Sequence, residues 1–491
     1  MFKGGRDLCE VAAGADSMLD RGEGERRVTM EKIVGLCKRR GFVFPSSEIY
    51  GGQGGVWDYG PMGIALKNNI AHAWWQDMTR LHDHIVGLDA AILMHPDVWR
   101  TSGHVDHFSD PLVDCTVCKS RFRADQVAVP SAGGPCPQCG GALTGVRNFN
   151  LMFSTHMGPT DERASLLYLR PETAQGIYVN YKNVLQTTRL KVPFGIAQIG
   201  KAFRNEIVTK NFIFRTCEFE QMEMQFFVRP AEDTHWFEYW CAQRWAFYQK
   251  YGVRMNHMRW RTHAAHELAH YARAACDIEY AFPMGFRELE GVHNRGDFDL
   301  TRHAQHSGKD LCYVDPDPNL DAAARRYVPC VVETSAGLTR CVLMFLCDAY
   351  TEEYVQAPNV AFSETTQTAD QEGAARTGEM RIVLRLHPAL SPTTVAFLPL
   401  VKKDGLVDLA RAVRDELRED FACDFDAAGA IGKRYRRQDE VGTPFCVTVD
   451  YQSKEDDTVT VRLRDSMAQR RVSRAFLAEF LRTEIKHYRR P

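Results

Sequence analysis

The chain has 491 residues, of which 44% are hydrophobic and 25% are charged, a composition typical of globular proteins with a sizeable core. This length predicts two or three domains, and no stretch is long and apolar enough to span a bilayer. The formal net charge of −2 excludes a globally basic nucleic-acid binder, although a slightly basic C-terminal part permits local contact with a polyanion.

The first 29 residues mix acidic and basic side chains without a long apolar run. Secretory signals need such a run, and transit peptides avoid acidic residues. Residues 1–29 are therefore predicted to be a disordered leader.

The cysteines are fifteen in number, and eleven of them are scattered singly along the chain. This pattern favours reduced thiols in a cytoplasm over a disulfide framework. The other four form two pairs, Cys115-x-x-Cys118 and Cys136-x-x-Cys139, separated by 17 residues. Paired knuckles of this kind make a tetrahedral thiolate cage. A structural Zn²⁺ is predicted in an insertion at about residues 110–145, the alternative being reduced thiols without metal.

The first half of the chain shows helical and then strand patterns. Gly60 and Pro61 open a predicted helix whose apolar stripe continues to Ile85. Residues 195–207 and 217–228 are predicted to be two strands of an antiparallel hairpin around a long polar loop. Helical patterns return at 234–251 and 262–280, where Pro283 and Gly285 end the second helix. Residues 327–350 indicate a strand followed by a helix.

Residues 363–380 are rich in Thr, Gln, Ala, Gly and charge without periodicity, and are predicted to link two domains, 30–362 and 381–491. The second domain alternates regularly between strands and helices, which is typical of a compact α/β unit. Its predicted strands are 394–400, 445–451 and 458–464. Its predicted helices are 406–420, 429–442 and 473–487.

One face of the predicted hairpin carries an unusual set of side chains. Successive residues of a strand point to opposite faces, so Phe219 shares a face with Gln221, Glu223 and Gln225, and Arg204 shares one with Glu206. A solvated sheet face is the simpler interpretation. A binding floor is favoured because two arginines, Arg204 and Arg215, could hold phosphate bidentately beside an aromatic platform at Phe219.

Six segments in register resemble class II aminoacyl-tRNA synthetases, and the glycine-specific family among them in particular. Their order and spacing agree with that family from about Lys32 to the C-terminus. The six are Glu48–Gly63, Leu169–Tyr178, Phe203–Ile207, Phe214–Gln221, Glu288–Leu300 and Glu333–Arg340.

The resemblance implies an α+β fold in which an antiparallel sheet flanked by helices forms the catalytic domain and a C-terminal α/β domain binds the anticodon. It implies a cytoplasmic homodimer with motif 1, residues 60–85, at the interface. The implied activity is glycine–tRNA ligation. Glycine reacts with ATP to give glycyl-adenylate and pyrophosphate, and the glycyl group then passes to the 3′ end of tRNA(Gly) with release of AMP.

The same resemblance assigns roles in ATP binding and catalysis. Arg204 would hold the α-phosphate, and Arg340 would cover the adenine and reach the γ-phosphate. Glu288 and Glu333 would hold Mg²⁺, a hard cation that prefers oxygen ligands. The implied catalytic residues are Arg204, Arg340 and Glu288. The implied ATP-binding residues are Arg204, Asn205, Glu206, Phe214, Arg215, Thr216, Phe219, Glu288, Leu289, Gly337 and Arg340.

Glycine has no side chain to grip, so affinity must come from its ammonium and carboxylate groups, and selectivity from steric exclusion of larger amino acids. Carboxylates crowded round the ammonium would supply both. The residues that the resemblance implies for glycine binding are Arg100, Glu172, Glu220, Gln221, Glu223, Glu333 and Ser335. One position departs from the family, since Cys217 stands where Arg is common; an inert, half-buried thiol is expected there.

A short metalloprotease pattern offers a rival function. His266-Glu267-x-x-His270 spells HExxH on the predicted helix 262–280, with Glu290 downstream. Pro283 and Gly285 break the helix where a third ligand would have to be aimed, and the stretch aligns with a structural helix of the synthetase family. The two histidines are therefore interpreted as ordinary helix residues.

Two further alternatives remain within the synthetase resemblance. A class II enzyme for Thr, Pro or Ser is disfavoured by the glycine-family opening at residues 48–63 and by the absence of an editing-type domain. A catalytically dead, RNA-binding paralogue would be expected to lose Arg204, Arg340 or Glu288, and all three are present.

A basic cluster in the second domain comprises Lys433, Arg434, Arg436 and Arg437. Such a run usually marks a solvated helix face. The family resemblance places it in the anticodon-binding domain, where phosphate contacts position RNA and exposed bases supply specificity.

Overall fold

The computed structural model describes residues 28–127, 132–158, 166–207, 209, 211–269, 271–355 and 379–490. Nearly all of the predicted leader and most of the predicted linker lie outside these ranges. Within the described ranges, every helix is too short or too polar to cross a membrane.

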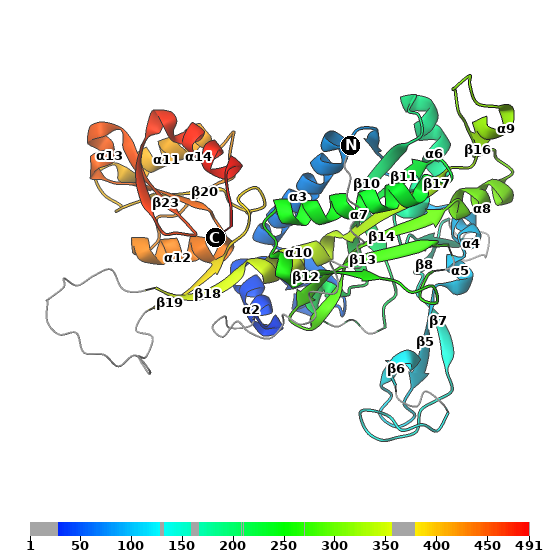
Figure 1. Ribbon diagram of the computed structural model, residues 1–491. Helices are drawn as coiled ribbons and strands as arrows, with labels where there is room; N and C mark the ends of the chain where they lie inside the picture. Colours follow the sequence, from blue (N-terminus) through cyan, green and yellow to red (C-terminus); the bar gives the residue numbers. More distant parts are fainter. Residues whose placement is uncertain are drawn as a thin grey trace, which may run out of the picture.

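A seven-stranded sheet forms the centre of the larger domain (Figure 1). Its strand order is β12-β13-β14-β17-β11-β10-β3, and every neighbouring pair is antiparallel except β10 and β3. The predicted hairpin is confirmed as β10 and β11. The strands are β3 (Ile85–Gly87), β10 (Phe194–Phe203), β11 (Glu218–Val228), β12 (Met258–Thr262), β13 (Ala274–Phe282), β14 (Gly285–Gly296) and β17 (Cys330–Gly337).

One face of the sheet, here called the back face, packs against helices and forms the main core. Alternate residues of β11, Met222, Met224 and Phe226, point into this core. They meet apolar side chains of four helices, among which α7 and α10 cross the sheet in Figure 1. The helices are α2 (Met30–Arg40), α3 (Pro61–Gln76), α7 (Asp233–Lys250) and α10 (Leu338–Ala349).

The opposite face is covered only at one end. There α6 (Ala174–Thr188) and α8 (Phe298–Ser307) bury a smaller core that includes Tyr181, Phe194 and Phe227. The remainder of this face carries the polar side chains predicted from strand alternation and is hollowed into a cavity. We call it the cavity face.

The helix that begins at Pro61 ends earlier than its apolar stripe predicts. Leu66, Ile70 and Trp74 are buried as expected. A π-helical turn, Asp77–Leu81, follows the regular helix, leaving the Leu81 side chain 63% exposed. Ile85 lies on β3, so its place in the stripe reflects the buried start of a strand rather than a further helical turn.

The predicted helix at 262–280 is wrong. The chain forms β12, a turn around residues 265–267 and then β13, and Gly285 opens the following strand rather than ending a helix. Burial of alternate residues, Cys276, Ile278, Tyr280 and Phe282, against the main core outweighs the helix propensity of the Ala-rich segment.

The segment that holds β5, β6 and β7 projects from the larger domain in Figure 1, and the cysteine pairs lie between β5 and β7. It is reached through the short helices α4 (Pro96–Thr101) and α5 (His104–His107). Its three-stranded sheet has the order β6-β5-β7. The strands are β5 (Ser109–Asp114), β6 (Arg121–Arg123) and β7 (Arg147–Asn150).

Short strands complete the larger domain at its edges. These are β1 (Val43–Pro45) with β2 (Trp57–Tyr59), β4 (Leu93–Met94) with β9 (Leu166–Leu169) and β8 (Ser154–His156), and β15 (Tyr313–Val314) with β16 (Arg326–Tyr327) beside α9 (Ala322–Arg325).

The C-terminal domain is an α/β unit around a five-stranded sheet of order β21-β20-β22-β23-β24. All of its predicted strands and helices are present; β21, β24 and α13 are additional. The strands are β20 (Val395–Pro399), β21 (Cys423–Phe425), β22 (Phe445–Val449), β23 (Thr458–Leu463) and β24 (Gln469–Ser473). The helices are α11 (Leu406–Leu417), α12 (Ile431–Val441), α13 (Tyr451–Asp456) and α14 (Leu477–Lys486).

A two-stranded sheet connects the two domains. β18 (Tyr350–Val355) follows α10 and pairs with β19 (Glu379–Leu384). On β19, the buried Arg381 donates from Nε to Asp439 of α12 at 2.7 Å, and Asp439 also forms an ion pair with Arg462. The larger domain is thereby joined to the smaller one through paired strands and a buried ion cluster.

Candidate active site

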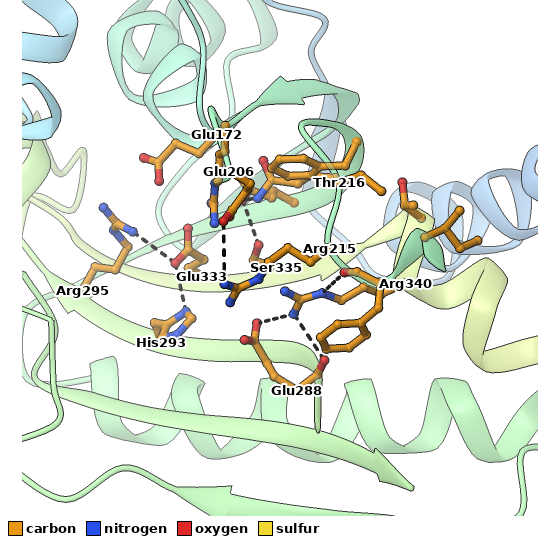
Figure 2. A pocket seen from close by; sticks show the side chains of 18 of the residues that line it. Glu172, Glu206, Arg215, Thr216, Glu288, His293, Arg295, Glu333, Ser335 and Arg340 are labelled. Carbon is orange, nitrogen blue, oxygen red and sulfur yellow. Dashed lines mark hydrogen bonds and ion pairs between the residues drawn. The ribbon is translucent and has the colours of Figure 1, made fainter. Parts of the chain in front are cut away.

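A solvent-open cavity occupies the cavity face of the large sheet. Its floor comes from β11, β14 and β17, and its rim from the segments before α6 and around residues 204–216. Figure 2 shows carboxylates and cations alternating across it. The lining residues are Glu172, Arg204, Glu206, Ile213, Phe214, Arg215, Thr216, Phe219, Gln221, Glu223, Tyr271, Glu288, His293, Arg295, Glu333, Ser335, Gly337, Thr339 and Arg340.

Two irregularities in β14 determine which of its side chains reach the cavity. The register against β13 shifts between Ile278 and Glu279, so that Leu289 is an extra residue and the alternation changes phase there. Glu290 therefore points to the back face, while Glu288, two residues earlier, lines the cavity. A second shift against β17 falls between Asn294 and Gly296, beside Arg295.

Glu223 occupies the deep part of the cavity. Its carboxylate accepts hydrogen bonds from Thr173 Oγ1 (2.6 Å), Ser335 Oγ (2.8 Å) and Gln221 Nε2 (3.0 Å). Burial, together with the negative charges of Glu333 and Glu172, raises the pKa of Glu223 to about 8. An added cation would be strongly favoured here, because it would stabilise the ionised carboxylate.

Glu333 lies on β17, and its charged neighbours differ from those of Glu223. It accepts from Arg295 Nη1 at 3.1 Å and from Gln225 Nε2 at 2.8 Å, and His293 Nδ1 lies 3.0 Å away. Burial alone would raise its pKa, but the Arg295 charge and the His293 contact outweigh burial and set the pKa of Glu333 at about 2. Glu333 is therefore an anion compensated within the protein.

Glu172 precedes α6 and is fixed at both oxygens. Gln175 Nε2 donates to Oε1 at 3.1 Å, and His104 Nε2 lies 3.3 Å from Oε2. Burial raises the pKa of Glu172, but the charges of His104 and Arg295 outweigh burial and hold the pKa well below its usual range. Glu172 therefore faces the cavity as a carboxylate.

Arg204 and Phe219 form the part of the floor predicted to receive nucleotide. The Arg204 guanidinium carbon lies 5.2 Å from the centre of the Phe219 ring, and its Nε donates to the Pro171 carbonyl at 3.1 Å. With Nε engaged, the terminal nitrogens remain for an anion. Phosphate is a suitable anion because a guanidinium can meet two of its oxygens at once.

Arg340 begins the opposite wall, in the first turn of α10. Its Nη1 lies 3.3 Å from the Glu288 carboxylate, and its guanidinium carbon lies 4.6 Å from the centre of the Phe214 ring (Figure 2). The charge of Arg340 holds the pKa of Glu288 below its usual range. At the rim, Arg215 pairs with Glu206 at 3.6 Å.

Four of the expected site residues do not line the cavity. Glu220 points to the back face, where Lys67 Nζ donates to it at 2.6 Å. The bulge sends Leu289 into the main core. Asn205 donates its backbone N–H to the Leu151 carbonyl, and Arg100 is half-exposed on α4 beside Asp97. For Glu220 the strand parity already visible in the sequence argues against a place in the site.

Five lining residues were not predicted: Ile213, Tyr271, His293, Arg295 and Thr339. Arg295 is the most consequential, since it is buried, clamps Asp299 through two nitrogens and lies 3.8 Å from the centre of the Tyr271 ring. His293 and Arg295 lie within the family-like segment Glu288–Leu300, which also holds the expected site residue Glu288. Two basic side chains in the same segment as that carboxylate were the sequence signal that could have identified them.

The described residues of the HExxH pattern do not lie as a helical metal site requires. His266 and Glu267 lie in a turn rather than on a helix, Glu267 pairs with Arg261 at 2.6 Å, and His270 lies outside the described residues. Glu290 is buried against Arg244 on the back face. Glu290 is thus engaged by Arg244 and is not available as the third ligand of such a site.

The four paired cysteines do converge. Sγ of Cys115 lies 3.5 Å from that of Cys139, and Sγ of Cys118 lies 3.7 Å from that of Cys136. Ligands about 2.3 Å from a tetrahedral zinc have sulfur atoms about 3.8 Å apart. Among the described residues this is the one group of three or more His, Cys, Asp or Glu side chains close enough to share an ion.

The basic cluster of the C-terminal domain is partly internal. Arg434 is buried and donates to the carbonyls of Pro399 and Leu400. Arg437 pairs with Asp426, and Arg436 with Glu379. The usual interpretation of such a run as a solvated helix face therefore does not hold for Arg434. Cys217, in the larger domain, is half-buried as expected, and burial raises its pKa.

An antiparallel sheet with arginines on its hairpin and on the helix after β17, joined to an α/β domain, defines the class II aminoacyl-tRNA synthetases. Residues 394–484 match the family model "Anticodon binding domain". The chain is 64% identical to the glycine–tRNA ligase of Treponema denticola, covering 95% of this chain and 99% of that protein. It is 55% identical to the enzyme of the same name from Borreliella burgdorferi (94% and 99%) and 49% identical to that from Acetivibrio thermocellus (91% and 96%). The chain belongs to the glycine–tRNA ligase family.

Proposed function

We propose that the cavity on the sheet is where this enzyme activates glycine with ATP. As a glycine–tRNA ligase, the protein joins glycine to the 3′ end of its tRNA. The observation that carries the location is that Glu172, Glu223 and Glu333 line the same cavity as Arg204 and Arg340. An amino acid and a nucleoside triphosphate require these opposite charges side by side.

Glycine recognition is proposed to depend on Glu223 and Glu172. Glu223 lacks a cationic partner among the described residues, so the substrate ammonium would supply the missing charge. Ser335 faces Glu223 across paired strands and limits the room beside it. A methyl group on the substrate Cα would have to displace these hydrogen-bonded side chains, which gives steric selectivity against larger amino acids.

Activation is proposed to proceed by direct displacement. A carboxylate oxygen of glycine attacks the α-phosphorus, the bond to the bridging oxygen of pyrophosphate breaks, and glycyl-adenylate and pyrophosphate form. Arg204 would stabilise the charge that develops on the α-phosphate, and Arg340 the departing phosphates. Phe219 and Phe214 offer apolar faces to the adenine ring. In the second step the 3′-terminal hydroxyl of the tRNA attacks the glycyl carbonyl and AMP leaves.

Mg²⁺ is proposed to bind at Glu288, where it would offset the triphosphate charge. The Glu288 side chain is 52% exposed and its carboxylate faces the cavity beside Arg340. Glu333 fits this role poorly, because Arg295 and His293 already compensate its charge. Of the two carboxylates expected to hold Mg²⁺, Glu288 and Glu333, we therefore assign the metal to Glu288 only.

A structural Zn²⁺ is proposed at Cys115, Cys118, Cys136 and Cys139, on the strength of their sulfur spacing. Metal analysis of the purified protein should give about one zinc per chain. The variant Cys118→Ser should lose it and unfold at a lower temperature. Retention of a full zinc equivalent by that variant would contradict the assignment.

The assembly and location of the protein are proposed from its surface and its thiols. Ile64 and Leu81, within the predicted dimer region, are 39% and 63% exposed and apolar, which suits a buried role in a homodimer. All fourteen cysteines of the described residues are free, which suits a cytoplasm. Contact of the C-terminal domain with the anticodon of tRNA(Gly) completes the proposal.

Amino-acid-dependent exchange of pyrophosphate into ATP tests the proposed site. The wild-type protein should exchange with glycine and not with alanine, serine, threonine or proline. The variant Glu223→Gln should lose glycine-dependent exchange while retaining ATP binding, measured by calorimetry. Undiminished exchange in that variant would sink the assignment of the glycine pocket.

A further inference from the structure

The base of the cysteine-containing insertion lies against both ends of the proposed active site. α5 ends at His107, Phe108 follows, and β5 then leads to Cys115. The returning strand β7 is fastened to the same place. Asn150 Nδ2 donates to the Val105 carbonyl at 2.7 Å, and Leu151 N–H donates to the Phe108 carbonyl at 2.9 Å. The insertion is thus anchored at residues 104–108 by both of its strands.

His104 contacts the glycine end of the site. Its Nε2 lies 3.3 Å from Glu172 Oε2, and its Nδ1 lies 2.7 Å from Ser102 Oγ. The side chains of His104 and Glu172 are only 12% and 14% exposed, so little water competes for this contact. Since Gln175 takes the other oxygen of Glu172, removing His104 would free the carboxylate to rotate.

Phe108 contacts the nucleotide end of the site. The centre of its ring lies 5.3 Å from the guanidinium carbon of Arg204, almost as close as the Phe219 ring on the sheet floor. An aromatic face beside a guanidinium attracts its charge and restricts its motion. The rings of His104 and Phe108 lie 5.5 Å apart, so the two contacts belong to one packed unit.

We propose that His104 and Phe108 are positioning residues with separate tasks. His104 orients Glu172 for the glycine ammonium, and Phe108 orients Arg204 for the α-phosphate. The insertion then serves as a second wall that sets two side chains of the site, besides being a metal-stabilised module. This inference rests on the proposed function, because it assigns the two contacts to the glycine and ATP subsites.

The two tasks predict different kinetic signatures in glycine-dependent pyrophosphate exchange. Loss of a hydrogen bond to a charged group corresponds to about a 10- to 100-fold effect. His104→Ala should therefore raise KM for glycine by that factor and leave KM for ATP nearly unchanged. His104→Gln, which keeps an N–H donor, should recover part of the loss. Ser102→Ala should change KM for glycine in the same direction but less.

Phe108→Ala should instead lower kcat by about 3- to 30-fold, the range expected for a cation–π contact, with little change in KM for glycine. Phe108→Tyr keeps the aromatic face and should retain most of the rate. Asp106→Asn is the matched control, since Asp106 is exposed on the same short helix and is not among the residues that line the proposed site. It should behave as wild type.

Thermal unfolding and zinc content, measured on every variant, separate positioning from folding. The inference holds if variants of wild-type unfolding temperature and zinc content show the split between KM for glycine and kcat. It is overturned if both alanine variants change the same parameter, or if neither changes any. Failure of the wild-type protein to exchange with glycine would refute the proposed function instead.

Discussion

Two buried ionic clusters lie on opposite faces of the same sheet and differ in charge balance. On the back face, Arg244 Nε donates to Glu290 at 2.6 Å, Arg244 Nη1 donates to Asp77 at 3.1 Å, and Tyr248 donates to Glu290 at 2.6 Å. On the cavity face, Glu223 receives three neutral donors beside two further carboxylates. Glu290 on the back face is paired directly with a guanidinium, whereas Glu223 has no cationic partner among the described residues.

This difference distinguishes a structural ion cluster from a binding site. A buried carboxylate with its own guanidinium has no electrostatic need for a ligand, and its role is confined to the fold. A buried carboxylate whose pKa rises to about 8, first because of its burial and then because other carboxylates lie near it, is stabilised when a cation arrives. The lack of a cation beside Glu223 among the described residues thus indicates a substrate group of positive charge, such as the glycine ammonium.

The largest expected effect comes from breaking the back cluster. Glu290→Gln leaves Arg244 buried without its main partner and should lower the free energy of unfolding by about 3–5 kcal/mol. Urea denaturation measures this change. The triple variant Asp77→Asn, Arg244→Met, Glu290→Leu, which removes all three charges of the cluster, should recover much of the loss. If the single variant were as stable as wild type, the cluster would not support the fold.

Removing a cation from the cavity should affect the reaction more than the fold. Arg204→Ala should lower kcat/KM for pyrophosphate exchange by about 10²–10³-fold, the usual effect of losing one oxyanion donor. Its unfolding midpoint should stay close to that of wild type, in contrast with Glu290→Gln. A loss of stability with intact exchange would reverse the two roles and contradict the comparison.

The raised pKa of Glu223 predicts a pH dependence of glycine binding. Below about pH 8 the empty site holds a proton that must leave before an ammonium can bind, so kcat/KM for glycine should rise with pH and level off near that value. The same shift destabilises the unliganded protein as pH rises from 4.5 toward 8, since the unfolded carboxyl releases its proton more readily than the folded one. Glycine-dependent exchange across roughly pH 6 to 8.5 tests the binding claim. A flat profile would contradict it.

The smallest effect should follow from Glu220→Gln. Glu220 neighbours Gln221 in sequence but lies on the back face, where it is paired with Lys67 on α3. Loss of this partly exposed pair should cost about 0–1 kcal/mol of stability and leave KM for glycine within about twofold of wild type. A tenfold rise in that KM would show that the back face also reaches the glycine site.

The sequence predicted those elements for which the alternation of side chains and the family-like segments indicate the same structure. Strand parity placed Phe219, Gln221 and Glu223 on one face, and all three line the cavity. The helix predicted at 262–280 failed because Ala-rich composition was weighed above the alternation of Ile278 and Tyr280, whose burial only the folded core reveals. Local propensity gives way to such tertiary burial.

The finer features of the site depended on contacts distant in sequence. The pairing of Arg295 with Glu333 joins residues 38 apart, and that of His104 with Glu172 depends on how the insertion folds back. Glu288 faces the cavity because of the register shift at Leu289. The sequence does not reveal this shift, because a bulge interrupts the alternation of side chains by which a strand is recognised. The basic cluster was misjudged at Arg434 because composition does not distinguish buried from solvated guanidinium groups.

The extra residue at Leu289 constrains how this strand can evolve. Substitutions along β14 alter one side chain at a time and leave the others in place. Deleting Leu289 itself would remove the bulge and leave Glu288 opposite Glu279 and Glu290 opposite Ile278, so the two carboxylates would keep their opposite faces. Deleting a residue beyond it, such as Gly291, would instead shift Glu290 toward the cavity face. Descendants of this gene should therefore tolerate the loss of Leu289 far more readily than the loss of one of its paired neighbours in the strand.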